Sequence, residues 1–159
     1  MFQEKTLKDR RPRAHFLTGF DFSSPKPFEV VGLGLNAVDN LCVVPHFPRY
    51  DSKLRMLDFS QQGGGQAATA MVACQRLGLT TRYVGKSGEG EFGHYSRRSL
   101  EEEKVDIQGV KIVAGARNQF AFILIDQTTG ERTIIWDRDQ RLVMLPGEVP
   151  RDIICSAKV

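Results

Sequence analysis

From residue 28 onward, short apolar runs alternate with one longer apolar segment. Residues 28–35 (FEVVGLGL) form a mostly apolar, β-branched run, which predicts a strand buried on both faces. Residues 66–77 are apolar on nearly every side and have helical length, which predicts an interior helix ending at Gly78. Residues 80–85 predict the next strand. A strand, a helix and a strand in this order predict a parallel sheet.

The second half of the chain predicts a further helix and a hairpin. The helix spans about residues 91–105, and a short strand follows at residues 110–113. Residues 119–126 and 131–136 are two apolar strands on either side of a glycine-containing loop, which is the clearest hairpin signal in the sequence. Because hairpin strands are antiparallel, we expect a second, antiparallel sheet beside the parallel one.

Two other stretches fit the strand pattern less well. Residues 39–62 contain two short extended stretches interrupted by Pro45 and Pro48, which favours edge or irregular positions. Residues 152–159 form an apolar run with no turn after it. We expect a strand there that stops in mid-course and leaves a sheet edge exposed.

Composition excludes several classes of protein. The chain has 159 residues, 41% hydrophobic and 26% charged, and no apolar stretch approaches the ~18 residues of a membrane helix. Its N-terminus is charged where a signal peptide would be apolar. The cysteines form no CxxC pair and no cluster with histidine, so we expect neither disulfides nor a zinc site. They are Cys42, Cys74 and Cys155. We therefore expect a cytoplasmic protein that contacts no membrane.

The net charge of +3 is concentrated in the first 27 residues, which hold six basic and three acidic side chains. A basic extension of this kind can contact nucleic acid. It carries no recognition motif, however, so we expect residues 1–27 to be a poorly ordered tail without a nucleic-acid partner. Residues 28–159 are expected to form the folded domain.

One glycine motif suggests a dinucleotide site. Residues 32–37 (GLGLNA) follow a predicted strand and have the GxGxxA form of dinucleotide-binding loops. That function would make the chain a fragment of a Rossmann-type NAD(P)-binding oxidoreductase. Such a loop requires a helix directly after it, whereas residues 38–44 lead into β-branched side chains and Pro45. An extended chain at this point would exclude the oxidoreductase.

A second glycine motif suggests a site for hydroxyl groups. Residues 62–66 (QGGGQ) precede the apolar helix, and Asp39 follows the first predicted strand. Glycines at a helix start expose backbone amides, and a carboxylate can accept two hydroxyl hydrogen bonds, each worth roughly 1.5–3 kcal/mol. Together they predict a polyol site at the carboxyl end of the strand. An alternative explains the same residues equally well: Asp39 caps a turn, and the glycines only permit close packing.

Three motifs, in this order, resemble the ribokinase-like carbohydrate kinases, also called PfkB-type kinases. The motifs are residues 31–39 (VGLGLNAVD), 64–78 (GGQAATAMVACQRLG) and 85–93 (GKSGEGEFG). The resemblance covers residues 28–159. It implies an α/β, ribokinase-like fold with a parallel sheet flanked by helices and a small antiparallel β lid. The lid strands would lie at about residues 40–62 and 111–137, and the chain looks truncated.

The resemblance implies ATP-dependent phosphorylation of a hydroxyl group on a small-molecule sugar or nucleoside, with Mg²⁺. By resemblance, Asp39 binds substrate hydroxyls. Gly64 and Gly65 present their backbone to the sugar, and Gln66 adds a side-chain contact. Thr69 is also placed at the substrate, but many members have Asn at its position. The sugar specificity of the best-known members therefore does not carry over.

The lid implies further contacts. Asn118, Phe120 and Arg138 lie where lid residues could meet the substrate, although packing within the lid is favoured for Phe120. By resemblance the lid can also form a homodimer contact. A non-catalytic module for sugar binding or dimerisation remains as an alternative function.

The catalytic segment of the family, Gly-Ala-Gly-Asp, is missing from the sequence. Its Asp is the general base, and phosphoryl transfer depends on such positioned groups. The acids nearest the C-terminus all stand outside a glycine-rich helix start: Asp137, Asp139, Glu148 and Asp152. We therefore expect no catalytic residue and no metal site in this chain, with the base beyond Val159. ATP and Mg²⁺ would belong to the full-length enzyme, and the 159-residue chain alone should be inactive.

Overall fold

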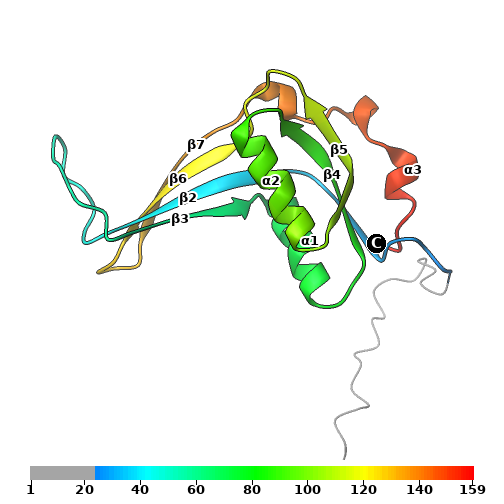
Figure 1. Ribbon diagram of the computed structural model, residues 1–159, viewed down its shortest axis with the longest axis horizontal. Coiled ribbons are helices and arrows are strands. Elements are labelled where there is room, and N and C mark those ends of the chain that lie inside the picture. The colour runs from blue at the N-terminus through cyan, green and yellow to red at the C-terminus, as the bar shows by residue number, and fades with distance from the viewer. Residues whose placement is uncertain (1–23) are drawn as a thin grey trace, which may run out of the picture.

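The computed structural model describes residues 24–159, which form two β-sheets and a layer of helices (Figure 1). The first sheet is parallel and has the spatial order β1 (Val30–Leu33), β4 (Thr81–Gly88) and β5 (Asp106–Val113). The second sheet has the order β3 (Asp58–Gly64), β2 (Ala37–Val44), β6 (Phe120–Asp126) and β7 (Arg132–Asp137). Most of the expected tail lies outside the described residues.

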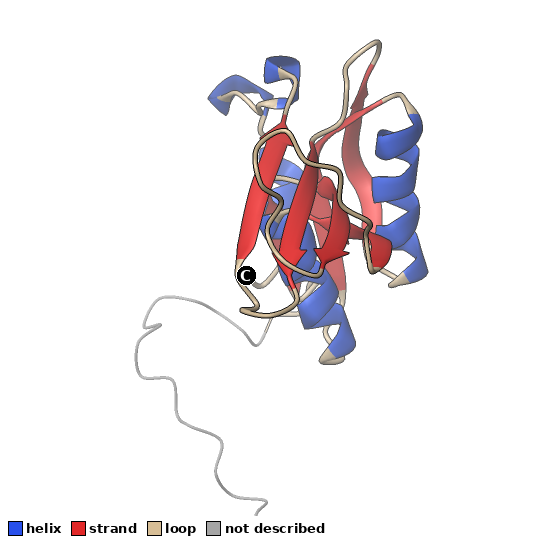
Figure 2. Cartoon of the chain, turned by 90° about the vertical axis from the view of Figure 1, so that its left-hand side faces the viewer, coloured by secondary structure: helices blue, strands red, loops and turns tan. Residues whose placement is uncertain are grey.

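Two helices pack on the face of β4 that carries Tyr83 (Figures 1 and 2). They are α1 (Gln66–Arg76) and α2 (Glu91–Glu102). The shared core joins both helices to β4 through five buried side chains: Ala68, Met71, Tyr83, Leu100 and Val105. The predicted succession of strand, helix and strand with a parallel sheet is therefore confirmed.

Two expectations for this layer are wrong. Helix α1 is not an interior helix, because it buries Ala68 and Met71 against the sheet while its other side faces solvent. Strand β1 is half-buried rather than buried on both faces, since it lies at the end of the sheet order, next to β4. The end of α1 is confirmed, because the chain leaves the helix at Gly78 with a φ of +90°.

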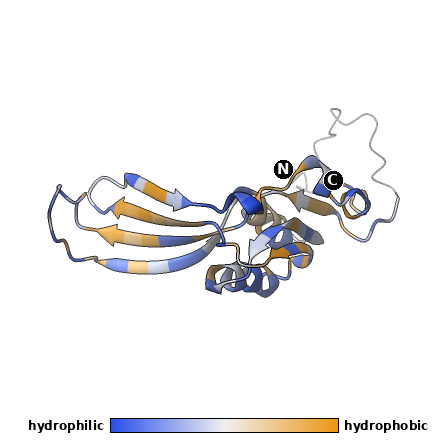
Figure 3. Ribbon diagram, turned by 90° about the horizontal axis from the view of Figure 1, so that it is seen from above, coloured by the Kyte–Doolittle hydropathy of each residue, from blue (hydrophilic) through white to orange (hydrophobic). Residues whose placement is uncertain are grey.

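The second sheet extends away from the helices as an arm of four strands (Figure 3). Strands β6 and β7 form the predicted antiparallel hairpin. Strand β2 lies inside the sheet, antiparallel to β3 and parallel to β6, so the sheet is mixed rather than purely antiparallel. Pro45 and Pro48 lie in the connection after β2 and interrupt neither strand. Residues 111–113 belong to β5 in the parallel sheet, not to the second sheet.

The expected strand over residues 152–159 is wrong for its first part, whereas residues 157–159 form backbone hydrogen bonds with residues 28–31. The C-terminal part of the chain forms the 3₁₀ turns η2 (Gln140–Leu142) and η3 (Pro146–Glu148) and the short helix α3 (Arg151–Ile154). Asp152 in the first turn of α3 favours a helix at this position. Beyond the helix, Ala157 forms a parallel bridge with Phe28, next to β1. No helix within residues 24–159 is long and apolar enough to cross a membrane.

Candidate functional site

Two segments that join the sheets cross at Asn36 and Gly65. Gly65 has a φ of +95°, and a Cβ atom on it would lie 2.6 Å from the Cα atom of Asn36, so the crossing requires glycine. Asn36 is buried, and its Nδ2 donates to Tyr83 Oη and to the Lys86 carbonyl, each at 2.8 Å. Its Oδ1 accepts a hydrogen bond from Ser96 Oγ at 2.8 Å. These bonds fix the start of the second sheet to β4 and α2.

The Tyr83 hydroxyl makes a further hydrogen bond at this crossing of Asn36 and Gly65, which we call the joint. Burial raises the pKa of Tyr83 to about 12, although the hydrogen bond from Asn36 lowers it. The hydroxyl therefore stays protonated at neutral pH and donates to the Gly34 carbonyl at 2.7 Å.

Asp39 lies three residues beyond Asn36, inside β2, and not after the first strand as the sequence predicts. Because it lies within a strand, it caps no turn. Its carboxylate faces Gly64, where a Cβ atom would overlap Oδ2. Asp39 is half-buried, and burial raises the pKa of its carboxyl group. No residue in the described part of the chain donates a hydrogen bond to this carboxylate.

The face of the second sheet that carries Asp39 forms a cavity of about 400 Å³. Strand register places Asp39 beside Ala121, and Ala121 beside Trp136. The lining combines polar side chains with apolar ones: Leu35, Asp39, Gln119, Ala121, Ile123, Ile134, Trp136 and Arg138. A cavity of this size and lining can hold a small molecule with hydroxyl groups and an apolar face.

Two of the residues that line this cavity have a buried polar atom without a partner in the described chain. The Nε atom of Arg138 and the Oε1 atom of Gln119 are buried and have no hydrogen-bond partner within residues 24–159. Arg138 is expected from the sequence as a lid contact, whereas the sequence argument misses Gln119. Strand alternation is the signal that could have found it, because Gln119 lies two residues before Ala121 and so shares its face.

Other predicted contacts lie outside this cavity. Asn118 is buried, and its Oδ1 accepts a hydrogen bond from the Gly88 N–H at 3.0 Å. Phe120 points to the opposite face of the sheet and packs on Phe92, with ring centroids 5.2 Å apart, which is the packing role that the sequence favours. Gln66 is exposed at the start of α1.

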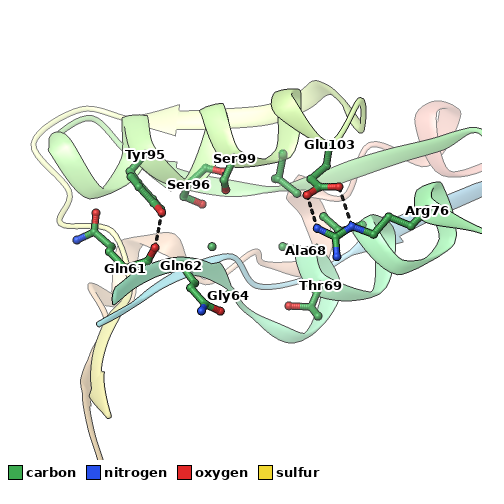
Figure 4. A pocket seen from close by; sticks show the side chains of 13 residues that line it. Gln61, Gln62, Gly64, Ala68, Thr69, Arg76, Tyr95, Ser96, Ser99 and Glu103 are labelled. Atoms are coloured by element: carbon green, nitrogen blue, oxygen red, sulfur yellow. Dashed lines mark hydrogen bonds and ion pairs between the residues drawn. The ribbon is translucent and has the colours of Figure 1, made fainter. Parts of the chain in front are cut away.

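Thr69 lines a second cavity of about 380 Å³ between α1, α2 and β3 (Figure 4). Consecutive strand residues point to opposite faces. A Cβ atom on Gly63 would lie 2.5 Å from Ser99 Oγ, whereas one on Gly64 would meet Asp39. Strand β3 therefore stands between the side chains of α2 and the Asp39 carboxylate.

The sequence matches the pfkB family of carbohydrate kinases over residues 29–159. This chain belongs to that family. Fructokinase-2 of Solanum lycopersicum is 37% identical to it over 103 residues, which are 64% of this chain and 31% of the relative. The chain of this pfkB family member thus spans about a third (31%) of the length of such curated relatives.

Solved structures share the fold of this pfkB family member. The fructokinase from Xylella fastidiosa has a TM-score of 0.56 at 28% identity and covers 69% of this chain and 32% of its own. The ribokinase from Cryptococcus neoformans in complex with ADP has a TM-score of 0.60 at 23% identity and covers 69% and 34%. The expected ribokinase-like α/β fold is confirmed. The dinucleotide-binding alternative is excluded, because residues 37–44 are a strand where that loop needs a helix.

The side chains of the described part of this pfkB family chain bear on whether it could hold ATP and Mg²⁺. Within residues 24–159 no three His, Cys, Asp or Glu side chains gather as metal ligands would. The sequence also has no Gly-Ala-Gly-Asp segment. The groups that residues 24–159 do bring together, around Asp39, suit a hydroxylated ligand.

Proposed function

We propose that this chain is the sugar-binding portion of an ATP-dependent carbohydrate kinase, which phosphorylates a hydroxyl group of a sugar or nucleoside. The observation that supports this most is the Asp39 carboxylate, which is half-buried, unpaired within the described residues and directed at Gly64. Family membership supports the reaction class. The name of the relatives, fructokinase, favours a small monosaccharide as the substrate.

Asp39 binds the sugar by accepting hydrogen bonds from two of its hydroxyl groups. Burial has removed part of the water from this carboxylate, which is why its pKa is raised. Sugar hydroxyls replace that water with charge-assisted hydrogen bonds, each worth about 1.5–3 kcal/mol. Gly64 has no side chain, which leaves room for the Asp39 carboxylate beside the backbone of β3. The reacting hydroxyl is thereby held in a fixed orientation.

The other side chains of the cavity complete the sugar site. Ile134 and Trp136 pack on the C–H face of the sugar and exclude water, which would compete as a phosphoryl acceptor. Arg138 donates a hydrogen bond to a sugar oxygen from its buried Nε. Gln66 and Thr69 lie outside this cavity and are not part of the proposed site.

ATP supplies the transferred phosphoryl group in such kinases, with Mg²⁺ offsetting its charge. Residues 24–159 bind the sugar, orient its hydroxyl group and shield it from water. The general base is expected in a segment that the 159 residues do not contain. This chain by itself is therefore expected to bind a sugar without consuming ATP.

The second sheet is the proposed lid of the site and the proposed contact between two copies. On the face opposite the cavity, Phe122 and Ile135 are 44% and 62% exposed, which suits burial by a partner. The three cysteines are free, which suits the cytoplasmic location that we propose.

An Asp39→Asn substitution in the full-length protein tests this function. Sugar-dependent ATP consumption is measured with a panel of hexoses, pentoses and nucleosides. The substitution should lower kcat/KM about 100-fold, because an uncharged carboxamide replaces the charged acceptor. Asp58→Asn, an exposed acid on β3, is the matched control and should leave kcat/KM unchanged. Unchanged kinetics in Asp39→Asn, or no turnover with any compound of the panel, would contradict the proposal.

A further inference from the structure

We infer, on the basis of the proposed sugar site around Asp39, that Gln119 determines which sugars the protein accepts. Its side chain binds one particular hydroxyl group of the substrate, together with Arg138. Both residues line the same cavity as Asp39.

The backbone fixes Gln119 at one end of this cavity. The Gln119 carbonyl accepts a hydrogen bond from the Val38 N–H at 3.0 Å, which continues the parallel pairing of β6 with β2. Asp39 pairs with Ala121 in the same register. Because side chains alternate along a strand, Gln119 lies on the face of Ala121 and therefore on the face of Asp39.

Arg138 follows the second strand of the hairpin, as Gln119 precedes the first. Phe120 and Asp137 are the last pair of β6 and β7, and the residues one step further, Gln119 and Arg138, line the same cavity. Each brings a buried atom without a partner in the described chain, an acceptor in Oε1 of Gln119 and a donor in Nε of Arg138. Buried polar groups in proteins are nearly always hydrogen-bonded. An unpaired acceptor and an unpaired donor on residues of one cavity therefore indicate a ligand group that is both donor and acceptor.

A hydroxyl group is the sugar group with this property. Its proton is donated to Oε1 of Gln119, and its oxygen accepts from the Nε–H of Arg138. A carbonyl or ring oxygen only accepts, so it would leave Gln119 unpaired. Asp39 holds other hydroxyls of the same molecule. The substrate class is therefore a sugar with a free hydroxyl at the Gln119 end of the cavity, and the corresponding deoxysugar is excluded.

The expected discrimination is large. A deoxy analogue leaves both Gln119 and Arg138 buried without a partner. Sites built to bind a substrate hydroxyl reject the analogue without it by about 10⁴-fold or more. Only one hydroxyl of the sugar should show this effect through Gln119.

The experiment compares kcat/KM of the full-length protein for its preferred sugar and for each monodeoxy derivative of that sugar. In the unmodified protein, one deoxy position outside those bound by Asp39 should lower kcat/KM by about 10⁴-fold or more. Gln119→Met keeps the length of the side chain without its hydrogen bond. For that one deoxy position, this substitution should reduce the ratio of kcat/KM for the sugar to kcat/KM for its deoxy derivative at least about tenfold. The corresponding ratios for the other deoxy positions should stay unchanged. Gln108→Met, exposed on β5, is the matched control.

Thermal unfolding without sugar separates a binding role from a structural one. Gln119→Met removes a buried oxygen that has no partner, so the Tm should stay the same or rise. Unchanged deoxy ratios in Gln119→Met, or a lower Tm with equal losses for all sugars, would overturn the role of Gln119. Neither result would contradict the proposed role of Asp39, which Asp39→Asn tests separately. No sugar-dependent reaction in the unmodified protein would overturn both.

Discussion

The parallel sheet and the second sheet differ in how far their apolar side chains are exposed. On β4, Tyr83 and Val84 point to opposite faces of the sheet and are both 0% exposed. On β7, Ile135 and Trp136 also point to opposite faces, but they are 62% and 60% exposed. Burial of apolar surface stabilises a fold by about 25 cal/mol per Å². The parallel layer therefore carries most of the stability, and the second sheet presents its faces to a ligand or a partner.

The joint at Asn36 and Gly65 connects these two regions rigidly. Asn36 makes three side-chain hydrogen bonds to β4 and α2, and the next strand begins directly after it. Asp39 thus takes its position from the stable layer although it lies on the more exposed sheet. A binding site of this kind combines a fixed acceptor with an accessible cavity.

The largest effect on stability is expected at the joint. Gly65→Ala places a Cβ atom 2.6 Å from the Cα atom of Asn36 and also forces a residue with a side chain to a φ of +95°. It should lower the free energy of unfolding by about 3 kcal/mol, measured by urea denaturation. Gly130→Ala, in the hairpin of the second sheet, has a φ of +73° and open space around it, and should cost only about 1 kcal/mol. Equal losses in the two variants would contradict a specially constrained joint.

A smaller, pH-dependent effect is expected at the edge of the parallel layer. The hydrogen bond from Lys86 Nζ at 2.6 Å, followed by those from the Leu145 N–H and Lys111, lowers the pKa of Glu148 to about 2 from its usual 4.5. Because the pKa is depressed in the folded state, the stabilisation is fully present above pH 4.5 and is lost as the pH falls toward 2.

Urea unfolding between pH 6 and about pH 2.5 measures this effect. Glu148→Gln should be less stable than the unmodified protein at pH 6 and should lose less stability on acidification. Glu131→Gln, an exposed acid in the hairpin of the second sheet, should follow the unmodified protein at every pH. The same acid dependence in Glu148→Gln would show that Glu148 does not tie the C-terminal segment to the sheet.

The sequence predicts those parts of the fold that local patterns determine. The hairpin of β6 and β7 is confirmed because strand alternation and a glycine-containing loop specify it within 20 or so residues. The parallel pairing of β2 with β6 joins segments about 80 residues apart in sequence, which no local pattern indicates. The first part of the apolar run 152–159 is mispredicted as a strand, because a short apolar run does not distinguish a strand from a helix.

In the candidate site, too, local patterns predict some features, whereas others depend on long-range pairing. The glycine motif, the acid and the family resemblance together select Asp39 and Gly64, and the structure places the Asp39 carboxylate against Gly64. The sequence predicts short extended stretches within residues 39–62 but places Asp39 just after the first strand rather than inside β2, because β1 ends after four residues and the joint redirects the chain. Gln119 becomes visible only when the register of β6 is known, since its neighbours in space come from β2 and the end of β7.

The smallest effect on stability is expected for Ile135→Ser. Ile135 lies beside Phe122 on the face of the second sheet opposite the cavity. Because it is largely exposed, its replacement should change the free energy of unfolding by less than about 0.5 kcal/mol. If two copies pair through this face, as we propose, the same change should raise the dimer dissociation constant about tenfold or more. Sedimentation equilibrium measures this, with Thr133→Ser on the same face as the control. An unmodified protein that is already monomeric, or a dimer that Ile135→Ser leaves intact, would show that this face of the second sheet makes no contact between copies.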